Sequence, residues 1–243
     1  MRLFGLIGSP LTHSFSKKYF AEKFSREAVN DSRYELFPIP SIDALPALLA
    51  ANPSLHGLNV TIPYKEQVLA FTHEQDRVVQ EIGASNCIRI TGGKLVAYNT
   101  DVTGFEQSLM VNWSGHHRKA LVLGTGGASK AVLYVLRKLG LEVISVSRKR
   151  SASSMAYEDI SAAVLREHTL VVNTTPLGTY PEVDGLPSLP YEAINPEHYF
   201  FDLVYNPPLT RFLELAAARG ATIRNGQDML QIQAEESWRI WNA

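Results

Sequence analysis

A glycine-rich turn between an apolar strand and a helix constrains the fold of this chain more than any other feature. The pattern predicts a strand over Lys119–Leu123, a turn over Gly124-Thr-Gly-Gly127, a helix over Lys130–Leu139 and a second strand over Glu142–Val146. Glycines there let the backbone approach a pyrophosphate, which the N–H groups and dipole of the helix N-terminus can bind. We therefore predict a βαβ dinucleotide-binding unit, although Ser129 replaces the third glycine of the usual pattern. A plain strand-to-helix turn is the alternative.

Basic residues follow the second strand of this unit. The sequence there reads Ser147-Arg148-Lys149-Arg150, where a site that prefers NAD usually carries an acidic residue for the ribose 2′-hydroxyl. A guanidinium can bind an anionic 2′-phosphate or stack on the adenine. This cluster favours NADP over NAD, and a solvated run of charges is the alternative.

Strand and helix patterns alternate along most of the remaining chain, which is typical of α/β layers with parallel strands. We predict a hairpin around Gly92-Gly93, with strands over Asn86–Ile90 and Leu95–Tyr98. A helix over 228–241 ends the pattern, with no strand after it. The other expected strands cover 2–7, 34–37, 58–62, 170–172 and 200–203, and the other expected helices cover 17–28, 42–51 and 103–113.

Charge and cysteine content exclude several classes of protein. The 23 Lys and Arg residues nearly balance the 24 Asp and Glu residues, so nucleic acid and anionic membranes are not expected partners. Cys87 is the only cysteine, so no intrachain disulfide can form, which suits a reducing compartment. No apolar run reaches the ~18 residues that span a bilayer, and no signal peptide is recognisable at Met1–Ser14. We expect a cytoplasmic protein that binds small molecules.

Seven further blocks occur outside the glycine turn, in a fixed order. They are Ser9-Pro-Leu-Thr-His-Ser-Phe-Ser16, Gly57-Leu-Asn-Val-Thr-Ile-Pro-Tyr-Lys65, Ile82-Gly-Ala-Ser-Asn86, Asn99-Thr-Asp-Val-Thr-Gly104, Asn173-Thr-Thr-Pro-Leu-Gly178, Asp202-Leu-Val-Tyr-Asn-Pro207 and Met229-Leu-Gln-Ile-Gln-Ala234. With the glycine turn among them, this chain resembles shikimate dehydrogenase over essentially its whole length. The resemblance implies reversible reduction of 3-dehydroshikimate to shikimate by NADPH, a step of aromatic amino-acid biosynthesis.

The resemblance also implies the roles of particular residues. Lys65 and Asp101 are similar to the family's catalytic pair. A lysine ammonium can protonate the oxygen that becomes negative when a carbonyl receives hydride, and a neighbouring carboxylate would hold that ammonium. Solvated surface positions, or for Asp101 a helix cap before Thr103, are the alternatives. We interpret His13 as structural, since the pair already supplies an acid and its partner.

The remaining expected ligands divide into two sets. Neutral side chains suit a ring rich in hydroxyl groups, because they donate and accept hydrogen bonds. The resemblance places the substrate carboxylate on Ser14, Ser16 and Tyr205, and the ring on Asn59, Thr61, Asn86 and Gln233. It places the cofactor on Gly124, Thr125, Gly126, Gly127, Ala128, Ser147, Arg148, Lys149, Thr174, Pro176, Leu177, Gly226 and Met229. No metal is expected.

We predict two α/β domains. Residues 1–101 and 221–243 would form the substrate domain, and 102–220 a Rossmann-like NADP domain with a parallel sheet. The sequence departs from the family at Lys17-Lys18, where Pro is usual, and at Asn225, where Asp is common. Two alternatives stay open, a quinate/shikimate dehydrogenase that uses NAD and a non-catalytic regulator that binds NADP or shikimate. Lys65 and Asp101 argue against the regulator, and either a monomer or a homodimer is compatible with the sequence.

Overall fold

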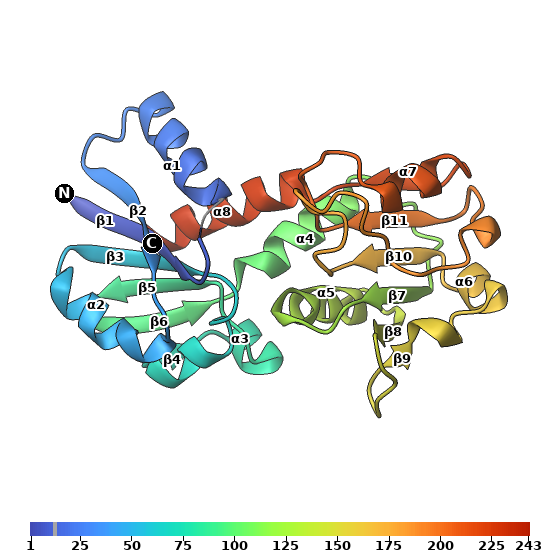
Figure 1. Ribbon diagram of the computed structural model, residues 1–243. Helices are drawn as coiled ribbons and strands as arrows, with labels where there is room; N and C mark the ends of the chain where they lie inside the picture. Colours follow the sequence, from blue (N-terminus) through green and yellow to red (C-terminus); the bar gives the residue numbers. More distant parts are fainter. Residues whose placement is uncertain (12–13) are drawn as a thin grey trace. The chain divides into compact units, whose positions relative to one another are not determined.

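The computed structural model describes residues 1–11 and 14–243 and contains two compact units (Figure 1). Residues 1–100 and 233–243 form the first unit, and residues 101–232 form the second. The chain passes from one to the other at the start of helix α4 (Thr100–Met110) and returns within helix α8 (Gln227–Trp241).

The first unit contains a mixed six-stranded sheet. Its strands are β1 (Arg2–Gly8), β2 (Ser32–Pro38), β3 (Leu55–Val60), β4 (Glu74–Gln75), β5 (Cys87–Thr91) and β6 (Lys94–Tyr98). They lie in the order β2-β1-β3-β5-β6-β4. Strands β1, β2 and β3 are parallel, whereas β5 runs antiparallel to both β3 and β6. The predicted hairpin is therefore confirmed, and both of its glycines have positive φ.

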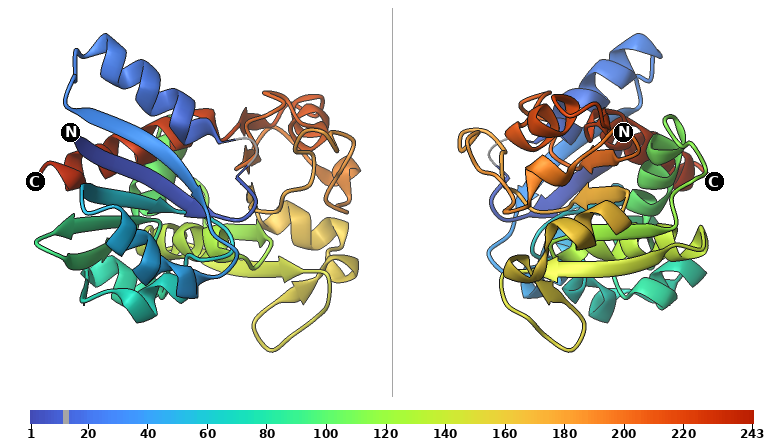
Figure 2. Two further views of the ribbon diagram at one scale, coloured as in Figure 1. Left: turned by 60° about the vertical axis from the view of Figure 1, so that its left-hand side comes forward. Right: turned by 90° about the vertical axis from the view of Figure 1, so that its right-hand side faces the viewer.

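Helices cover both faces of this sheet (Figure 2). Helix α1 (Phe15–Arg26) and the last turns of α8 pack on one face, where Phe20 and Trp241 lie against Phe4 and Tyr34. Helices α2 (Leu45–Ala51) and α3 (Arg77–Ile82), with the short 3-10 helices at 42–44 and 67–71, cover the other face. The buried aromatic cluster on the first face joins α8 to the N-terminal strand, because Trp241 stacks on Phe4 at 4.9 Å.

The second unit contains a six-stranded sheet in which every pair of neighbouring strands is parallel. Its strands are β7 (Lys119–Leu123), β8 (Glu142–Ser147), β9 (Met155–Ala156), β10 (Leu170–Asn173), β11 (Tyr199–Asp202) and β12 (Thr222–Arg224). Their order is β12-β11-β10-β7-β8-β9, so the direction of progression reverses between β7 and β10. Ligands of such sheets bind outside the carboxyl ends of the strands at this reversal.

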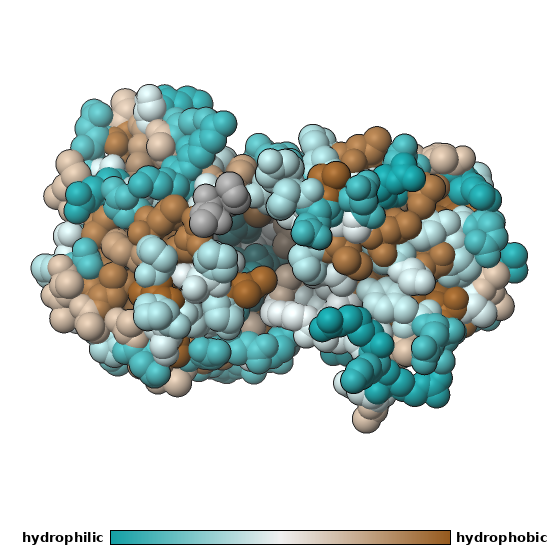
Figure 3. All heavy atoms as spheres, in the orientation of Figure 1, coloured by the Kyte–Doolittle hydropathy of each residue, from teal (hydrophilic) through white to brown (hydrophobic). Residues whose placement is uncertain are grey.

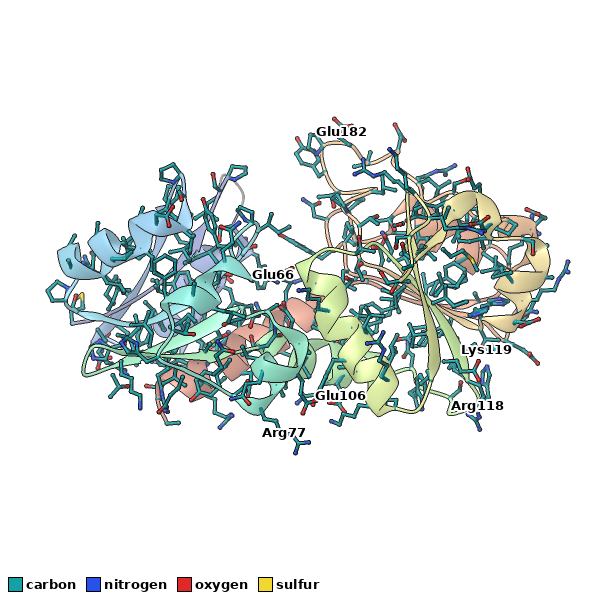
Figure 4. The ribbon with its side chains drawn as sticks, turned by 90° about the horizontal axis from the view of Figure 1, so that it is seen from below. Glu66, Arg77, Glu106, Arg118, Lys119 and Glu182 are labelled. Atoms are coloured by element: carbon teal, nitrogen blue, oxygen red, sulfur yellow. The ribbon has the colours of Figure 1, made fainter. Side chains whose placement is uncertain are left out.

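Helices again occupy both faces of the second sheet. Helix α5 (Gly127–Lys138) packs beside α4, where Lys138 pairs with Glu106 at 2.8 Å (Figure 4). Helices α6 (Ala162–Glu167) and α7 (Arg211–Ala217) contribute to the core on the other face. The predicted α/β class, with a parallel dinucleotide-type sheet built around the unit β7–α5–β8, is confirmed.

Some element boundaries differ from the expected ones. Helix α4 begins at Thr100 and not at Thr103, and α1 begins at Phe15 and not at Lys17. Strand β12 pairs with β11, so residues 222–224 belong to the second sheet, whereas we had placed everything from 221 onward in the first domain. Three residues of strand are too short to produce a recognisable hydrophobic period. Among the described residues, no helix is long and apolar enough to cross a membrane.

Candidate functional site

Residues from two of the sequence blocks lie together at the carboxyl ends of β1 and β3 in the first sheet. Thr61 follows β3, and its N–H donates to the carbonyl of Ile7 at the end of β1. Because β5 is antiparallel to β3, Asn86 at its start lies at the same edge, where its carbonyl accepts from the N–H of Val60. The carboxyl ends of β1 and β3 and the beginning of β5 thus bring together blocks that are far apart in the sequence.

Ser14 is the N-cap residue of α1, and its side chain does not cap the helix. Its hydroxyl oxygen is buried and has no hydrogen-bond partner among the described residues. A buried hydroxyl without a partner costs on the order of 1–3 kcal/mol, so this group needs a partner that the described residues do not supply. Thr12 and His13 lie outside the described residues, and the interpretation of His13 stays a prediction.

Lys65 follows the buried Tyr64, whose hydroxyl donates to the carbonyl of Ile39 at 2.6 Å. The carbonyl of Lys65 itself accepts from the N–H of Ser85 at 2.7 Å, which fixes its backbone beside the block that contains Asn86. The two bonds hold the lysine on a well-supported loop while its side chain remains half-exposed.

Asp101 lies in the first turn of α4 and is 7% exposed. Since α4 begins at Thr100, Asp101 is inside the helix and the alternative that it caps a later helix is wrong. A carboxylate in the first turn of a helix interacts favourably with the helix dipole.

Three predicted ring ligands of the first unit, Asn59, Asn86 and Gln233, are almost completely buried. Hydrogen bonds connect them to hydroxyl side chains that sequence reasoning did not select, those of Tyr34, Thr100 and Ser237. Isolated Tyr, Thr and Ser residues in strands and helices give no recognisable pattern, and only the position of Thr100 within the Asn99-Thr-Asp101 block offered a signal. Cys87 is buried beside them, and burial raises the pKa of its thiol to about 12.

The glycine-rich turn of the second unit lies at the reversal between β7 and β10. Gly124 has a φ of +104°, and an added Cβ would come within 2.7 Å of the Thr174 hydroxyl. That hydroxyl donates to the carbonyl of Leu123, so the two predicted cofactor blocks touch. Gly126 is the N-cap residue of α5, so no side chain caps this end of the helix, and the space where a Cβ would point is open. This combination fits a pyrophosphate at the helix N-terminus.

Ser129 explains why the third glycine is dispensable. Its hydroxyl donates to the carbonyl of Gly126 at 2.6 Å, and its N–H donates to the same carbonyl. The Ser129 side chain is small and buried. It holds the glycine-rich turn against the start of α5 and leaves the outer surface of the glycine-rich turn open.

The basic cluster after β8 contains two kinds of residue. Arg150 pairs with Asp159 at 2.7 Å, whereas Arg148 and Lys149 are exposed and form no ion pair with any described residue. The Ser147 hydroxyl bonds to Ser154 at 2.8 Å and so shapes the loop. Hydrophilic side chains gather over this loop between β8 and β9 (Figure 3). Arg148 and Lys149 are thus available to an anion, and Arg150 is already neutralised.

A buried carboxylate holds the two loops that follow β10 and β11. Asp202 accepts from the Thr210 hydroxyl at 2.6 Å, from the Asn173 amide at 2.9 Å and from the N–H of Val204. Burial raises its pKa to about 6, although these hydrogen bonds oppose the shift. Asp202 thereby fixes the loop that carries Tyr205, whose pKa is raised by burial. Sequence reasoning quoted Asp202 within a block but gave it no role.

The last predicted cofactor residues occupy different surroundings. Pro176 and Leu177 are exposed on the loop after β10, and Met229 is buried in α8. A Cβ on Gly226 would lie 2.2 Å from the carbonyl oxygen of Leu203, so close packing alone requires this glycine. No group of three His, Cys, Asp or Glu side chains that could hold a metal occurs in the described part of the chain.

A parallel sheet with a glycine turn at its reversal point, joined to a second α/β unit rich in buried polar groups, is the arrangement of a nicotinamide-dependent oxidoreductase. A family profile described as the shikimate dehydrogenase substrate binding domain matches residues 6–88. The chain is 35% identical to a shikimate dehydrogenase (NADP(+)) of Halothermothrix orenii, over 98% of this chain and 89% of that one. This chain belongs to the shikimate dehydrogenase family.

Two solved structures show how the fold is used elsewhere. Shikimate 5-dehydrogenase of Thermus thermophilus, in complex with NADP(H) and shikimate, is 34% identical with a TM-score of 0.86, covering 99% of this chain and 93% of that one. The 5-ketofructose reductase of a Gluconobacter strain is 26% identical with a TM-score of 0.85, covering 99% and 92%. The fold therefore also supports a reductase that is named for a different substrate.

Proposed function

We propose that this chain is an NADP-dependent shikimate dehydrogenase that reversibly reduces 3-dehydroshikimate to shikimate in the biosynthesis of aromatic amino acids. The observation that carries the proposal is the carboxyl ends of β1 and β3, where Thr61 and Asn86 lie close together, along with the buried Ser14 hydroxyl, which has no partner among the described residues. Neutral hydroxyl and amide groups are what a polyhydroxylated ring requires. The names of the relatives agree with this chemistry.

Lys65 is the proposed general acid. NADPH, when bound, supplies the hydride, and the carbonyl oxygen that becomes negative takes a proton from the Lys65 ammonium. In the direction of shikimate oxidation, the neutral amine of Lys65 accepts the proton from the hydroxyl group. Asp101 holds and orients the ammonium and accepts a hydrogen bond from the ring. The loop contacts of Tyr64 and Lys65 support this role, because a proton donor must be placed accurately.

The substrate carboxylate is assigned to Ser14, Ser16 and Tyr205, and the ring to Asn59, Thr61, Asn86 and Gln233. The pyrophosphate of the cofactor is assigned to Gly124–Ala128, where the N-terminus of α5 is free of a side-chain cap. Arg148 and Lys149 bind the 2′-phosphate beside Ser147. Thr174, Pro176, Leu177, Gly226 and Met229 border the ribose and nicotinamide. Residues 1–101 with the C-terminal helix are the proposed substrate domain, and the domain between them holds NADP.

The protein is proposed to act in the cytoplasm, as a monomer or homodimer. Its single buried cysteine, which needs no oxidising compartment, supports this location.

Nicotinamide absorbance tests the proposal directly. Purified protein is mixed with shikimate or quinate, each with NADP or NAD, and the rise in absorbance of the reduced cofactor is followed. 5-Ketofructose with NADPH serves as a comparison substrate, for which the absorbance of NADPH falls. We expect the highest kcat/KM for shikimate with NADP. A preference for quinate with NAD, or for 5-ketofructose, would replace the assigned substrate. Binding of shikimate without any turnover would favour a regulator.

A further inference from the structure

A continuous set of buried hydrogen bonds links the substrate-side residues of the first unit. It begins at Tyr34 in β2, whose ring stacks on Phe20 with 4.5 Å between centroids and is 5% exposed. The Tyr34 hydroxyl donates to Oδ1 of Asn59 at 2.8 Å. Burial raises the pKa of Tyr34, while a hydrogen bond with Ser16 acts in the opposite direction. Tyr34 therefore connects a predicted carboxylate ligand to a predicted ring ligand.

Asn59 uses both of its amide hydrogens inside the protein. Nδ2 donates to the Ser237 hydroxyl at 2.9 Å and to the carbonyl of Asn86 at 3.3 Å. To donate to a substrate, Asn59 would have to give up one of these two bonds. The Asn59 side chain therefore links β3 to β5 and to α8.

Thr100 contacts three further side chains of this set of hydrogen bonds. Its N–H donates to Oδ1 of Asn86 at 2.7 Å, and its hydroxyl accepts from Nδ2 of the same amide at 3.0 Å. The hydroxyl also lies 3.2 Å from the Ser237 hydroxyl and 3.4 Å from Oε1 of Gln233. The Ser237 hydroxyl in turn donates to the carbonyl of Gln233 at 2.9 Å. The side chains of Asn86 and Gln233, predicted to bind the ring, therefore both contact the Thr100 hydroxyl, and Ser237 acts on them through Thr100 and the main chain of Gln233.

We propose that Tyr34, Thr100 and Ser237, called here the hydroxyl set, are positioning residues that fix the orientation of Ser16, Asn86 and Gln233 toward the substrate, and that Asn59 acts as their link and not as a ligand. This inference rests on the proposed function. An amide side chain can turn over and exchange its donor for its acceptor. The hydroxyl set removes that freedom before the ring arrives, which lowers the entropy cost of binding.

The test compares two substitutions at one position. Thr100→Val keeps the shape and deletes the hydroxyl, whereas Thr100→Ser keeps the hydroxyl. We expect Thr100→Val to raise KM for shikimate about tenfold, which corresponds to ~1.4 kcal/mol, with kcat and KM for NADP little changed. Thr100→Ser should restore most of the affinity. Thr72→Val is the matched control, since Thr72 is in the same unit and its hydroxyl donates to the carbonyl of Leu69, outside this set.

The outcomes separate this inference from the proposed function. If wild-type protein neither turns over nor binds shikimate, the proposed function is wrong and this inference falls with it. If the wild type is active but Thr100→Val keeps its KM, or loses only kcat, the positioning role is wrong while the function stands. Should Thr100→Val fail to fold by circular dichroism, Tyr34→Phe carries the same test, because it retains the ring stacked on Phe20. An unchanged shikimate KM in Tyr34→Phe overturns the inference.

Discussion

The two units prepare for their ligands in opposite ways. In the first unit, Asn59, Asn86 and Gln233 are buried and take part in hydrogen bonds with one another or with neighbouring hydroxyl groups. In the second, Arg148 and Lys149 are exposed and form no ion pair with a described residue. A ring that must be held in one orientation requires fixed donors and acceptors, whereas a phosphate can be gripped by flexible charged side chains. Mutations should therefore have different signatures in the two units.

The largest expected effect is at Lys65. General acid–base catalysis typically contributes 10²–10⁴-fold, so Lys65→Met should lower kcat by roughly that factor while shikimate still binds. Asp101→Asn should also lower kcat. Steady-state kinetics of both variants and of the double variant test whether they act together, in which case the combined loss is smaller than the product of the single losses. A fully active Lys65→Met protein would refute the role.

Arg148→Ala should give the next largest effect, confined to the cofactor. Losing a charge-assisted hydrogen bond weakens binding by roughly 10- to 150-fold, so KM for NADP should rise by this amount and KM for NAD should change far less. Arg150→Ala is the matched control, because its guanidinium is already paired with Asp159. If both variants lose NADP affinity equally, or if Arg148→Ala weakens NAD and NADP alike, Arg148 does not bind the 2′-phosphate.

Ser14→Ala sharpens the comparison by separating binding from stability. The variant removes a buried hydroxyl that has no partner among the described residues, so we expect an unchanged or higher melting temperature and a KM for shikimate raised by about tenfold or more. Ser161→Ala provides the contrast, since Ser161 caps α6 by accepting from the N–H of Val164. There the melting temperature should fall, by the equivalent of ~1 kcal/mol, with KM unaffected. The opposite pattern would mean that Ser14 is structural.

Ser16→Ala should likewise raise KM for shikimate and leave KM for NADP unchanged, because its hydroxyl is assigned to the same carboxylate. Both constants come from one steady-state experiment. An unchanged KM for shikimate in the folded variant would contradict the assignment of Ser16.

Another prediction concerns the acid stability of the second unit. Burial, with His116 and His198 nearby, lowers the pKa of His117 to about 4. The unfolded chain binds a proton at its ordinary pKa of about 6.5 while the folded chain does not, so this stability is complete above that pH and is lost as pH falls toward 4. Thermal melts of wild type and His117→Gln should differ in their pH dependence over this range, by on the order of 1–3 kcal/mol. Parallel curves would exclude His117 as the cause.

The sequence predicted the fold where long apolar periods existed, as in β7, α5 and β8. It placed the start of α4 too late because the helix begins at Thr100, whose N–H is satisfied by the distant Asn86 side chain. It also could not find β12, which is defined by pairing with β11 and not by its own pattern. Helix and strand ends of this kind depend on tertiary partners, which a local pattern does not contain.

The candidate site was predicted as a set of blocks, and the structure supplies the reasons that connect them. Gly124 and Thr174 were both assigned to the cofactor, and they touch because β7 and β10 are neighbours. The pairing of Arg150 with Asp159 distinguishes it from Arg148, a difference that adjacent basic residues in a sequence cannot reveal. The hydroxyl set was missed because its members become recognisable only when β2, α4 and α8 are brought together.

The return of the chain in α8 sets an order for the folding of a newly made protein. Trp241 packs within the core of the first unit, its indole N–H donating to the carbonyl of Ile88, and Ser237 supplies the partner of Asn59. Until α8 has been synthesised, the first hundred residues lack both an aromatic ring of their core and a partner for a buried amide. The second unit, made later, ends at residue 232 and is therefore complete before the last residues of α8 are added. Pulsed hydrogen exchange should therefore show β7–β12 protected before β1–β3, although β1–β3 leave the ribosome first.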